Sequence, residues 1–188
     1  MDKKNELLAA AREVFAEKGY KAAGISDIAK KSHMAVGSFY KYYESKEAIF
    51  LEVYVAENSR IREGIMQRVD WQGKPEAIVE QLFAVTFELI SPNKILAEWN
   101  KPSISQILHD YYNQDSGRAS NAFHQFLIQT FSQRLQEEGF SKEKIAEIMK
   151  VYDLIYYIDM HVTEQEFSGY FDSLETLVKY FVKGIFSK

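Results

Sequence analysis

Small, hydroxyl-bearing and basic side chains follow one another between residues 36 and 46, and together they suit contact with a polyanion. Val36, Gly37 and Ser38 are small or slim, so a helix that presents them outward has the low relief needed to lie deep in a major groove. Hydroxyl and ammonium groups come next, on Tyr40, Lys41, Tyr42 and Lys46. Such groups can reach phosphates at the groove edge and fix the register of a helix on a duplex.

The charge of the chain is distributed unevenly, which favours an anionic partner at its front. The 188 residues carry a formal net charge of −4. Residues 1–46 hold nine Lys or Arg against six Asp or Glu, a net of +3, whereas residues 47–188 hold fourteen against twenty-one, a net of −7. A phosphate-facing surface is therefore expected within the first 46 residues.

The helices that must position these side chains can be predicted from apolar spacing. Apolar residues return every three to four positions almost throughout, and only three prolines and nine glycines occur, so the chain is predicted to be all-α. A first helix should end with Gly19 as a left-handed cap. Two short helices follow, at about Ile25–Lys31 and Ala35–Tyr42, with about three residues between them. This spacing is typical of a tri-helical helix-turn-helix domain.

The remainder of the chain is predicted to be helical as well. Ser45 and Ser141 are good N-caps, the first for a long helix that runs to about Val69. Asp172 with Glu175 resembles a capping box for the last helix. The total is about nine helices, with the later ones at about 75–90, 91–101, 103–112, 118–138, 142–162 and 173–186 and a polar loop at 113–117. We divide the chain into an N-terminal domain, residues 1–46, and a C-terminal helical domain, residues 47–188.

A group of residues in the first three predicted helices and at the start of the fourth matches a family pattern. They are Ala10-Ala11, Phe15 and Gly19-Tyr20, then Asp27-Ile28-Ala29, then Gly37-Ser38-Phe39-Tyr40-Lys41-Tyr42-Tyr43 and Ser45-Lys46-Glu47. In these residues the segment from about Leu7 to Leu51 resembles the tetracycline-repressor (TetR) family. The resemblance implies that the helix at Val36–Tyr42 reads base edges, with Val36, Ser38 and Lys41 discriminating bases. It further implies that Tyr40, Tyr42 and Lys46 hold backbone phosphates.

Three positions depart from the usual family pattern. His33 stands where glycine is common in the turn, and it must adopt the left-handed conformation there. We interpret it as a turn residue in preference to a DNA contact. Ala35 replaces a serine N-cap, and Gly24 replaces a serine or threonine hydroxyl. Of Tyr42 and Tyr43, one should pack inward, and we assign Tyr42 to the phosphate.

The resemblance also implies a role for the C-terminal domain, because family members are usually homodimeric repressors that bind a small inducer there. Most aromatic residues of residues 47–188 should build the core, but a subset could line an inducer pocket. The predicted ligand-binding residues are Phe87, Trp99, Phe123, Phe126, Leu127 and Tyr152. The last two helices carry wide apolar stripes and are predicted to form the homodimer. Twofold symmetry would then set two reading helices about 34–36 Å apart on operator DNA.

Several function classes are disfavoured by the composition. The chain has no cysteine, and its histidines are scattered without a close acidic ligand pattern, so we expect no metal site, no cofactor and no enzymatic activity. No apolar run reaches eighteen residues and the start is too polar for a signal peptide, so we expect a cytoplasmic protein with no membrane contact. The predicted function is a DNA-binding transcriptional regulator, a repressor released from its operator by a small-molecule inducer. A regulator of the same fold controlled by a protein partner, and a structural helical dimer that does not bind DNA, remain as alternatives.

Overall fold

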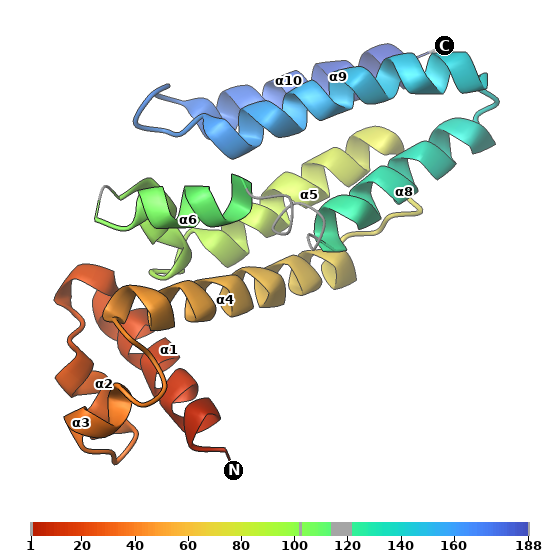
Figure 1. Ribbon diagram of the computed structural model, residues 1–188. Helices are drawn as coiled ribbons and strands as arrows, with labels where there is room; N and C mark the ends of the chain where they lie inside the picture. Colours follow the sequence, from red (N-terminus) through yellow and green to blue (C-terminus); the bar gives the residue numbers. More distant parts are fainter. Residues whose placement is uncertain (1, 102, 114–121, 188) are drawn as a thin grey trace. The chain divides into compact units, whose positions relative to one another are not determined.

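The computed structural model describes residues 2–101, 103–113 and 122–187, and in these ranges the chain consists of helices and turns with no strand (Figure 1). The elements are α1 (Lys3–Ala22), α2 (Ile25–Lys31), α3 (Val36–Phe39), α4 (Lys46–Arg68), α5 (Pro75–Ile90), the 3-10 helix η1 (Leu96–Asn100), α6 (Ser105–Asn113), α8 (Ala122–Glu137), α9 (Lys142–His161) and α10 (Tyr170–Phe186). The all-α prediction of about nine helices is confirmed over the described ranges. Most of the predicted loop at 113–117 and the start of the predicted helix at 118–138 lie outside them.

The chain divides into two compact units, and each is described by itself. The first unit comprises residues 1–64 and 87–118, and the second comprises residues 65–86 and 119–188. Helices α4 and α5 each contribute residues to both units. None of the described helices combines the length and the apolar character needed to cross a membrane.

The core of the first unit fixes α1, α2, α3 and the start of α4 to one another. Phe15, Ile28 and Phe39 have no exposed surface, and each comes from a different helix of the first three. Phe50 of α4 meets Phe15 edge to face at 4.9 Å between ring centroids. Burying several large apolar side chains at this junction stabilises the domain by about 1.5–3 kcal/mol for each of them.

Several local signals act as predicted. Gly19 has φ +73° and ψ 169° and interrupts the helical geometry of α1 before its last residues. His33 has φ +56° in the turn between α2 and α3. Ser45 Oγ accepts from Ala48 N–H at 3.2 Å, and Ser141 Oγ accepts from Lys144 N–H at 3.2 Å, so both serines cap the helices that follow them. These devices depend on residues within one turn of each other, which is why the sequence reveals them.

The predicted helix at Ala35–Tyr42 is too long. In the structure α3 is a single turn, and residues 40–42 form tighter turns. Lys41 N–H donates to Ser38 O at 3.3 Å and Tyr42 N–H donates to Phe39 O at 2.9 Å, which are three-residue closures. These closures follow directly after Phe39, whose ring is buried, and they precede the second inward-facing ring of this segment, Tyr43.

Two further helix predictions are wrong, because loop side chains accept hydrogen bonds from the backbone N–H groups at the start of the following helix. The helix expected at 91–101 is replaced by a turn and by η1, since Asn93 Oδ1 accepts from the N–H groups of Ile95 and Leu96, both at 3.1 Å. Helix α10 begins at Tyr170, so Asp172 lies inside its first turn and forms no capping box. Glu164 caps this helix instead, and its two carboxylate oxygens accept from Gly169 N–H at 2.6 Å and Tyr170 N–H at 2.9 Å.

The second unit contains its own apolar core. Val79 and Phe83 of α5 are buried with Leu174 and Val182 of α10, and Phe171 meets Phe83 at 5.5 Å between ring centroids. The same unit carries large apolar side chains that are exposed in the isolated chain. They are Val151, Leu154 and Tyr157 on α9, Phe167 in the following loop, and Leu177 and Tyr180 on α10.

Candidate nucleic-acid interface

Helix α3 is held by its inward side chain and presents a low, open outer surface. Phe39 is fully buried, whereas Val36 is 46% and Tyr40 is 57% exposed. Gly37 faces open space, because an added Cβ would meet no atom within 4 Å. Lys41 is exposed and Ser38 is half-buried next to it. The exposed surface of this segment therefore consists of Val36, Gly37, Tyr40 and Lys41, and a partner molecule can approach it closely.

The two adjacent tyrosines after α3 have different environments. Tyr43 is 6% exposed, and its hydroxyl donates to Glu52 Oε2 at 2.9 Å. Burial and this hydrogen bond raise the pKa of Tyr43 above its ordinary value. Lys4 pairs with the same Glu52 at 3.1 Å, which holds the start of α1 against α4. Tyr43 is thus the tyrosine that packs inward. Tyr42 is half-buried, and its contact with a phosphate stays a prediction.

The ammonium group of Lys46 forms hydrogen bonds within the N-terminal domain. Its Nζ donates to Tyr20 O and to Ala23 O, both at 3.0 Å, and lies 4.2 Å from the centroid of the Tyr20 ring. Tyr20 lies in the last turn of α1, after Gly19, and Ala23 lies in the connection to α2. An ammonium group has three N–H bonds, so a phosphate contact by Lys46 would have to use the third or displace one of these two. Sequence reasoning assigned Lys46 to phosphate and missed its structural role.

Tyr20 connects this turn to two other parts of the first unit. Its N–H donates to Glu98 Oε1 at 3.1 Å, and its hydroxyl donates to Glu47 Oε1 at 2.5 Å. The ring packs on Phe50 at 4.8 Å between centroids. Burial, together with the hydrogen bond to Glu47, raises the pKa of the Tyr20 hydroxyl. The carbonyl, amide, hydroxyl and ring of Tyr20 all have partners, so the end of α1 is fixed from several sides.

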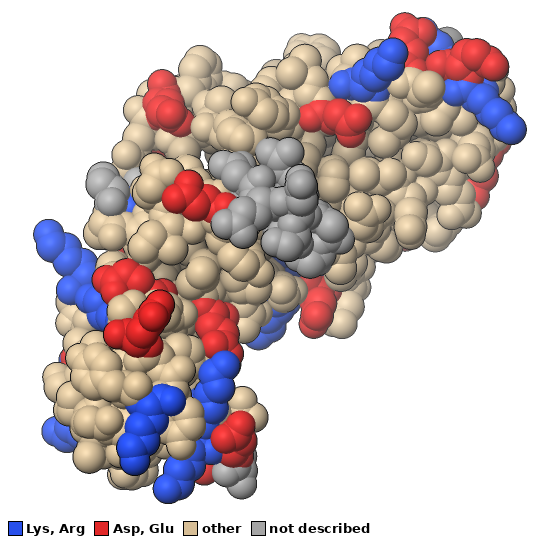
Figure 2. Space-filling model, viewed as in Figure 1, with Lys and Arg blue, Asp and Glu red and all other residues tan. Residues whose placement is uncertain are grey.

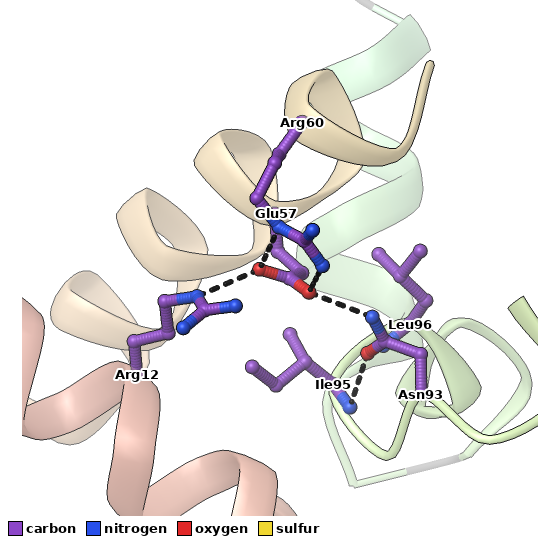
Figure 3. A network of polar contacts seen from close by, with 6 residues as sticks. All are labelled: Arg12, Glu57, Arg60, Asn93, Ile95 and Leu96. Atoms are coloured by element: carbon purple, nitrogen blue, oxygen red, sulfur yellow. Dashed lines mark hydrogen bonds and ion pairs between the residues drawn. The ribbon is translucent and has the colours of Figure 1, made fainter. Parts of the chain in front are cut away.

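A second polar contact centres on the buried carboxylate of Glu57 in α4 (Figure 3). Glu57 is 3% exposed and accepts from Arg12 Nε at 2.8 Å and from Arg60 Nη2 at 2.7 Å. Asn93 Nδ2 donates to the same carboxylate at 2.7 Å. Burial opposes ionisation, but the hydrogen bonds from Arg60, Arg12 and Asn93 prevail and lower the pKa of Glu57 to about 2. This carboxylate therefore ties α1, α4 and the segment before η1 together.

The basic side chains of residues 1–46 fall into two groups. Lys4, Arg12, Lys18 and Lys31 form ion pairs with carboxylates, and Lys46 binds carbonyl oxygens as described. Four others make no ion pair within the described part of the chain: Lys3, Lys21, Lys30 and Lys41. Figure 2 shows basic side chains over the end of the chain that Figure 1 draws in red and orange. These four lysines are available to an anion.

A hollow of about 230 Å³ opens beside the start of α3. Its polar lining consists of Lys3, His33, Ser38, Lys41 and Tyr42. Three of these residues belong to the set predicted to contact DNA, and the structure brings Lys3 from the start of α1 to the same place. Lys3 was not predicted, because its separation in sequence from α3 gives no sign of their proximity.

Comparison with known proteins matches the N-terminal part of the chain to one family. Residues 7–53 match the family described as bacterial regulatory proteins, tetR family. The N-terminal domain belongs to the tetR family. The chain is 40% identical over 62 residues to the HTH-type transcriptional regulator YdgC of Bacillus subtilis, over 33% of this chain and 32% of the relative. It is 29% identical over 119 residues to the HTH-type transcriptional regulator QacR of Staphylococcus aureus, over 62% of this chain and 59% of the relative.

These matches cover less than two thirds of the length of either relative. A solved structure of a tetR-family transcriptional regulator from Mesorhizobium loti resembles the fold more completely. Its TM-score is 0.56, with 22% identity over 97% of this chain and 94% of that chain. At this identity the likeness concerns the fold alone, and it extends the tetR-family fold beyond the matched N-terminal residues.

Two of the six predicted ligand-binding residues, Phe87 and Trp99, lie in the first unit. Phe87 is 60% exposed. Trp99 packs on His109 at 4.3 Å, on Tyr112 at 5.6 Å and on Tyr54 at 6.2 Å between ring centroids. His109 Nε2 is buried and has no hydrogen-bond partner among the described residues. The predicted ligand-binding set does not include Tyr54, His109 and Tyr112, although each is aromatic and at helical spacing from other inward residues.

The other four lie in the second unit: Phe123, Phe126, Leu127 and Tyr152. Phe123 is buried, and Phe126 meets the ring of Trp71 at 4.9 Å, edge to face. The hydroxyl of Tyr152 lies 3.4 Å from His124 Nδ1. Among the described residues no cluster of three or more potential metal ligands occurs.

Two carboxylates that organise the site were also missed by sequence reasoning. Glu57 lies between the buried residues Val53 and Ile61 at helical spacing, so it is an acidic residue inside an apolar stripe. That pattern could have identified it. Glu98 is 1% exposed, but no local pattern points to its contact with Tyr20, which lies 78 residues earlier.

Proposed function

We propose that this tetR-family protein is a sequence-specific DNA-binding regulator that represses transcription as a homodimer and is released from its operator by a small molecule. One observation carries the DNA-binding part. The match to the tetR family, residues 7–53, coincides with a short helix whose inner residue is buried and whose outer residues are small and open. Val36, Ser38 and Lys41 discriminate bases in this proposal, with Gly37 allowing close approach, and Tyr40, Tyr42 and Lys46 hold phosphates.

The homodimer is proposed on the second unit. Val151, Leu154 and Tyr157 repeat at intervals of three on α9, and Tyr157 and Leu154 are each more than half exposed. Leu177 and Tyr180 extend the exposed apolar character to α10. Operator recognition by a helix-turn-helix protein uses two copies related by a twofold axis. A second copy of this chain is therefore the proposed partner of the α9 and α10 surface.

The inducer is proposed to bind among aromatic side chains of the first unit around Trp99, and Phe87, Phe123, Phe126, Leu127 and Tyr152 stay predicted contacts. Support comes from the cluster around Trp99, where apolar rings adjoin a buried imidazole nitrogen that has no partner in the described chain. Such a mixture of aromatic surface and a few polar groups is typical of ligand sites. The ligand would be a neutral or cationic aromatic molecule, because Glu98 Oε2 in the first unit is buried without a hydrogen-bond partner among the described residues.

Release requires a connection from the ligand site to the DNA-binding helices, and the segment at 93–98 supplies one within the first unit. Asn93 contacts Glu57, which also binds Arg12 of α1. Lys94 Nζ donates to Glu17 O at 2.7 Å, and Glu98 accepts from Tyr20 N–H. A ligand that moves this segment would alter two direct contacts to α1 and the indirect one through Glu57 at once. By reciprocity, ligand would weaken DNA binding by the factor by which DNA weakens ligand binding.

Operator affinity measured against salt tests the DNA-binding proposal. A duplex from the promoter next to the gene should bind with a steep negative dependence of log affinity on log salt, of about 0.9 for each phosphate contact. Ser38→Ala should change the preference at one operator position, whereas Tyr42→Phe should weaken binding to all sequences about equally. A flat salt dependence would favour the structural dimer without DNA binding. Equal effects of the two variants would contradict the division between base and phosphate contacts.

Sedimentation tests the homodimer. Leu154→Glu places a charge in the proposed interface and should convert the dimer to monomer at micromolar concentration, because an unpaired charge is costly in an apolar contact. Lys142→Glu, an exposed position at the start of the same helix and off the face that carries Leu154, is the matched control and should leave the dimer intact. A dimer that survives Leu154→Glu unchanged would place the interface elsewhere.

A further inference from the structure

The hollow beside α3 has the chemistry of an anion site. Lys3 and Lys41 line it, and neither forms an ion pair within the described residues. Ser38 and Tyr42 add hydroxyl donors, and none of its lining residues is acidic. Two unpaired ammonium groups and two hydroxyls around one concavity generate a positive potential that attracts an oxyanion.

The imidazole of His33 also lines this hollow. The backbone N–H of His33 donates to Lys30 O at 3.2 Å and the residue has a φ of +56°, a conformation that glycine adopts with least strain. This backbone geometry orients an exposed side chain so that it lines the hollow with Lys3 and Lys41. The charged or titratable groups that share the hollow with it are the two lysines and the phenol of Tyr42.

We propose that the hollow seats a backbone phosphate of duplex DNA, held by Lys3 and Lys41 at any pH near neutrality and by His33 when its imidazole is protonated. This inference rests on the proposed DNA binding, adds Lys3 and His33 to the contacts, and reassigns Lys41 from a base contact to a phosphate contact. The occupant is a phosphodiester because the hollow adjoins the exposed outer face of α3, which is the surface proposed to enter the groove.

The consequence is a dependence of DNA affinity on pH. Histidine is the side chain that changes charge between about pH 5 and 8, and only its protonated form has two N–H donors. A phosphate in the hollow favours the protonated imidazole, so DNA binding should take up a proton at each DNA-binding domain. Affinity should therefore rise as the pH falls towards 5.5, and one more counterion per domain should be released on binding.

Fluorescence anisotropy with a 40-base-pair duplex of arbitrary sequence is a sufficient probe, because phosphate contacts do not depend on sequence. For the wild-type protein we expect affinity to be on the order of tenfold higher at pH 5.5 than at pH 8.0, about threefold per domain of a dimer. The salt dependence should steepen by about 0.9 per domain at the lower pH. His33→Asn retains a residue that tolerates positive φ but cannot titrate, and it should bind with both differences lost.

Three further variants make the outcome decisive. His161→Asn removes an imidazole from α9 in the second unit and should retain the full pH dependence of the wild type. Lys3→Gln should reduce the salt dependence by a similar amount at both pH values. His33→Gly serves if His33→Asn alters the circular dichroism spectrum. If His33→Asn and the wild type show the same pH dependence, this inference is overturned while DNA binding stands. If the wild type binds no duplex at any pH, the proposed function fails and the inference fails with it.

Discussion

Replacing Glu57 by glutamine should lower the free energy of unfolding at pH 7 by about 2 kcal/mol. The carboxylate is buried, and its pKa is lowered from 4.5 to about 2 by hydrogen bonds from Arg60, Arg12 and Asn93 that outweigh the effect of burial. Each pKa unit corresponds to about 1.4 kcal/mol, which gives roughly 3 kcal/mol as an upper limit. The side chains of Arg12 and Arg60 are about half exposed, at 47% and 56%, so screening by solvent reduces this figure to about 2 kcal/mol.

The sign of the pH effect follows from the direction of the shift. A carboxyl group whose pKa is lower in the folded state stabilises the protein above its unfolded pKa, near 4.5, and loses this contribution as the pH falls towards 2. The wild-type protein should therefore lose about 2 kcal/mol more than Glu57→Gln between pH 5 and pH 2.5. Urea unfolding followed by circular dichroism at fixed protein concentration measures both quantities.

A matched control is available on α9. Glu147 pairs with Lys144 at 3.0 Å with the same three-residue separation as Glu57 and Arg60, but both members of this pair are more than half exposed. Glu147→Gln should change the free energy of unfolding by less than about 0.5 kcal/mol. The reasoning is refuted if the two glutamine variants are equally destabilised, or if the deficit of Glu57→Gln persists undiminished at pH 2.5.

Three other substitutions test contacts that fix the helices. Gly19→Ala should destabilise the protein by about 1–2 kcal/mol in thermal unfolding, since Gly19 has φ +73° and the new Cβ would lie 3.1 Å from Glu98 Oε1; an unchanged midpoint would contradict the left-handed geometry. Lys46→Met should lower stability by about 1–2 kcal/mol even without DNA, because Tyr20 O and Ala23 O lose their donor; a variant of wild-type stability with weaker DNA binding would instead support a direct phosphate role. Glu164→Gln should reduce stability by about 1 kcal/mol and speed amide exchange in the first turn of α10, and unaltered exchange there would show that another group caps this helix.

Much of the fold could be predicted because its signals are local. The bounds of α2 and α5 agree with those expected from apolar spacing, and Pro75 begins α5 as its fixed φ favours. The DNA-binding helices could be located for the same reason, since small outward residues and one buried aromatic ring lie within a single turn of α3. The errors at η1 and at α10 arise where Asn93 and Glu164, side chains in loops, satisfy backbone N–H groups at a helix start.

The candidate site was only partly predictable, because basic residues look alike in a sequence. Lys46 and Lys41 both belong to the expected set, yet Lys46 binds two backbone carbonyls while Lys41 lines an open hollow. The difference depends on which groups the turn at 19–23 brings within reach. Sequence patterns carry no information on such distances.

The sequence by itself determined the helical class, the family of the N-terminal domain and the turns at Gly19 and His33, because each depends on residues close together in the chain. Only the tertiary structure decided that Tyr20 is held by Glu98 and Lys46, that Glu57 joins Arg12 to Asn93, and that Lys3 and His33 line one hollow beside α3. These partners are separated by 26 residues or more along the chain. Packing of the helices, and not local pattern, brings such groups close together.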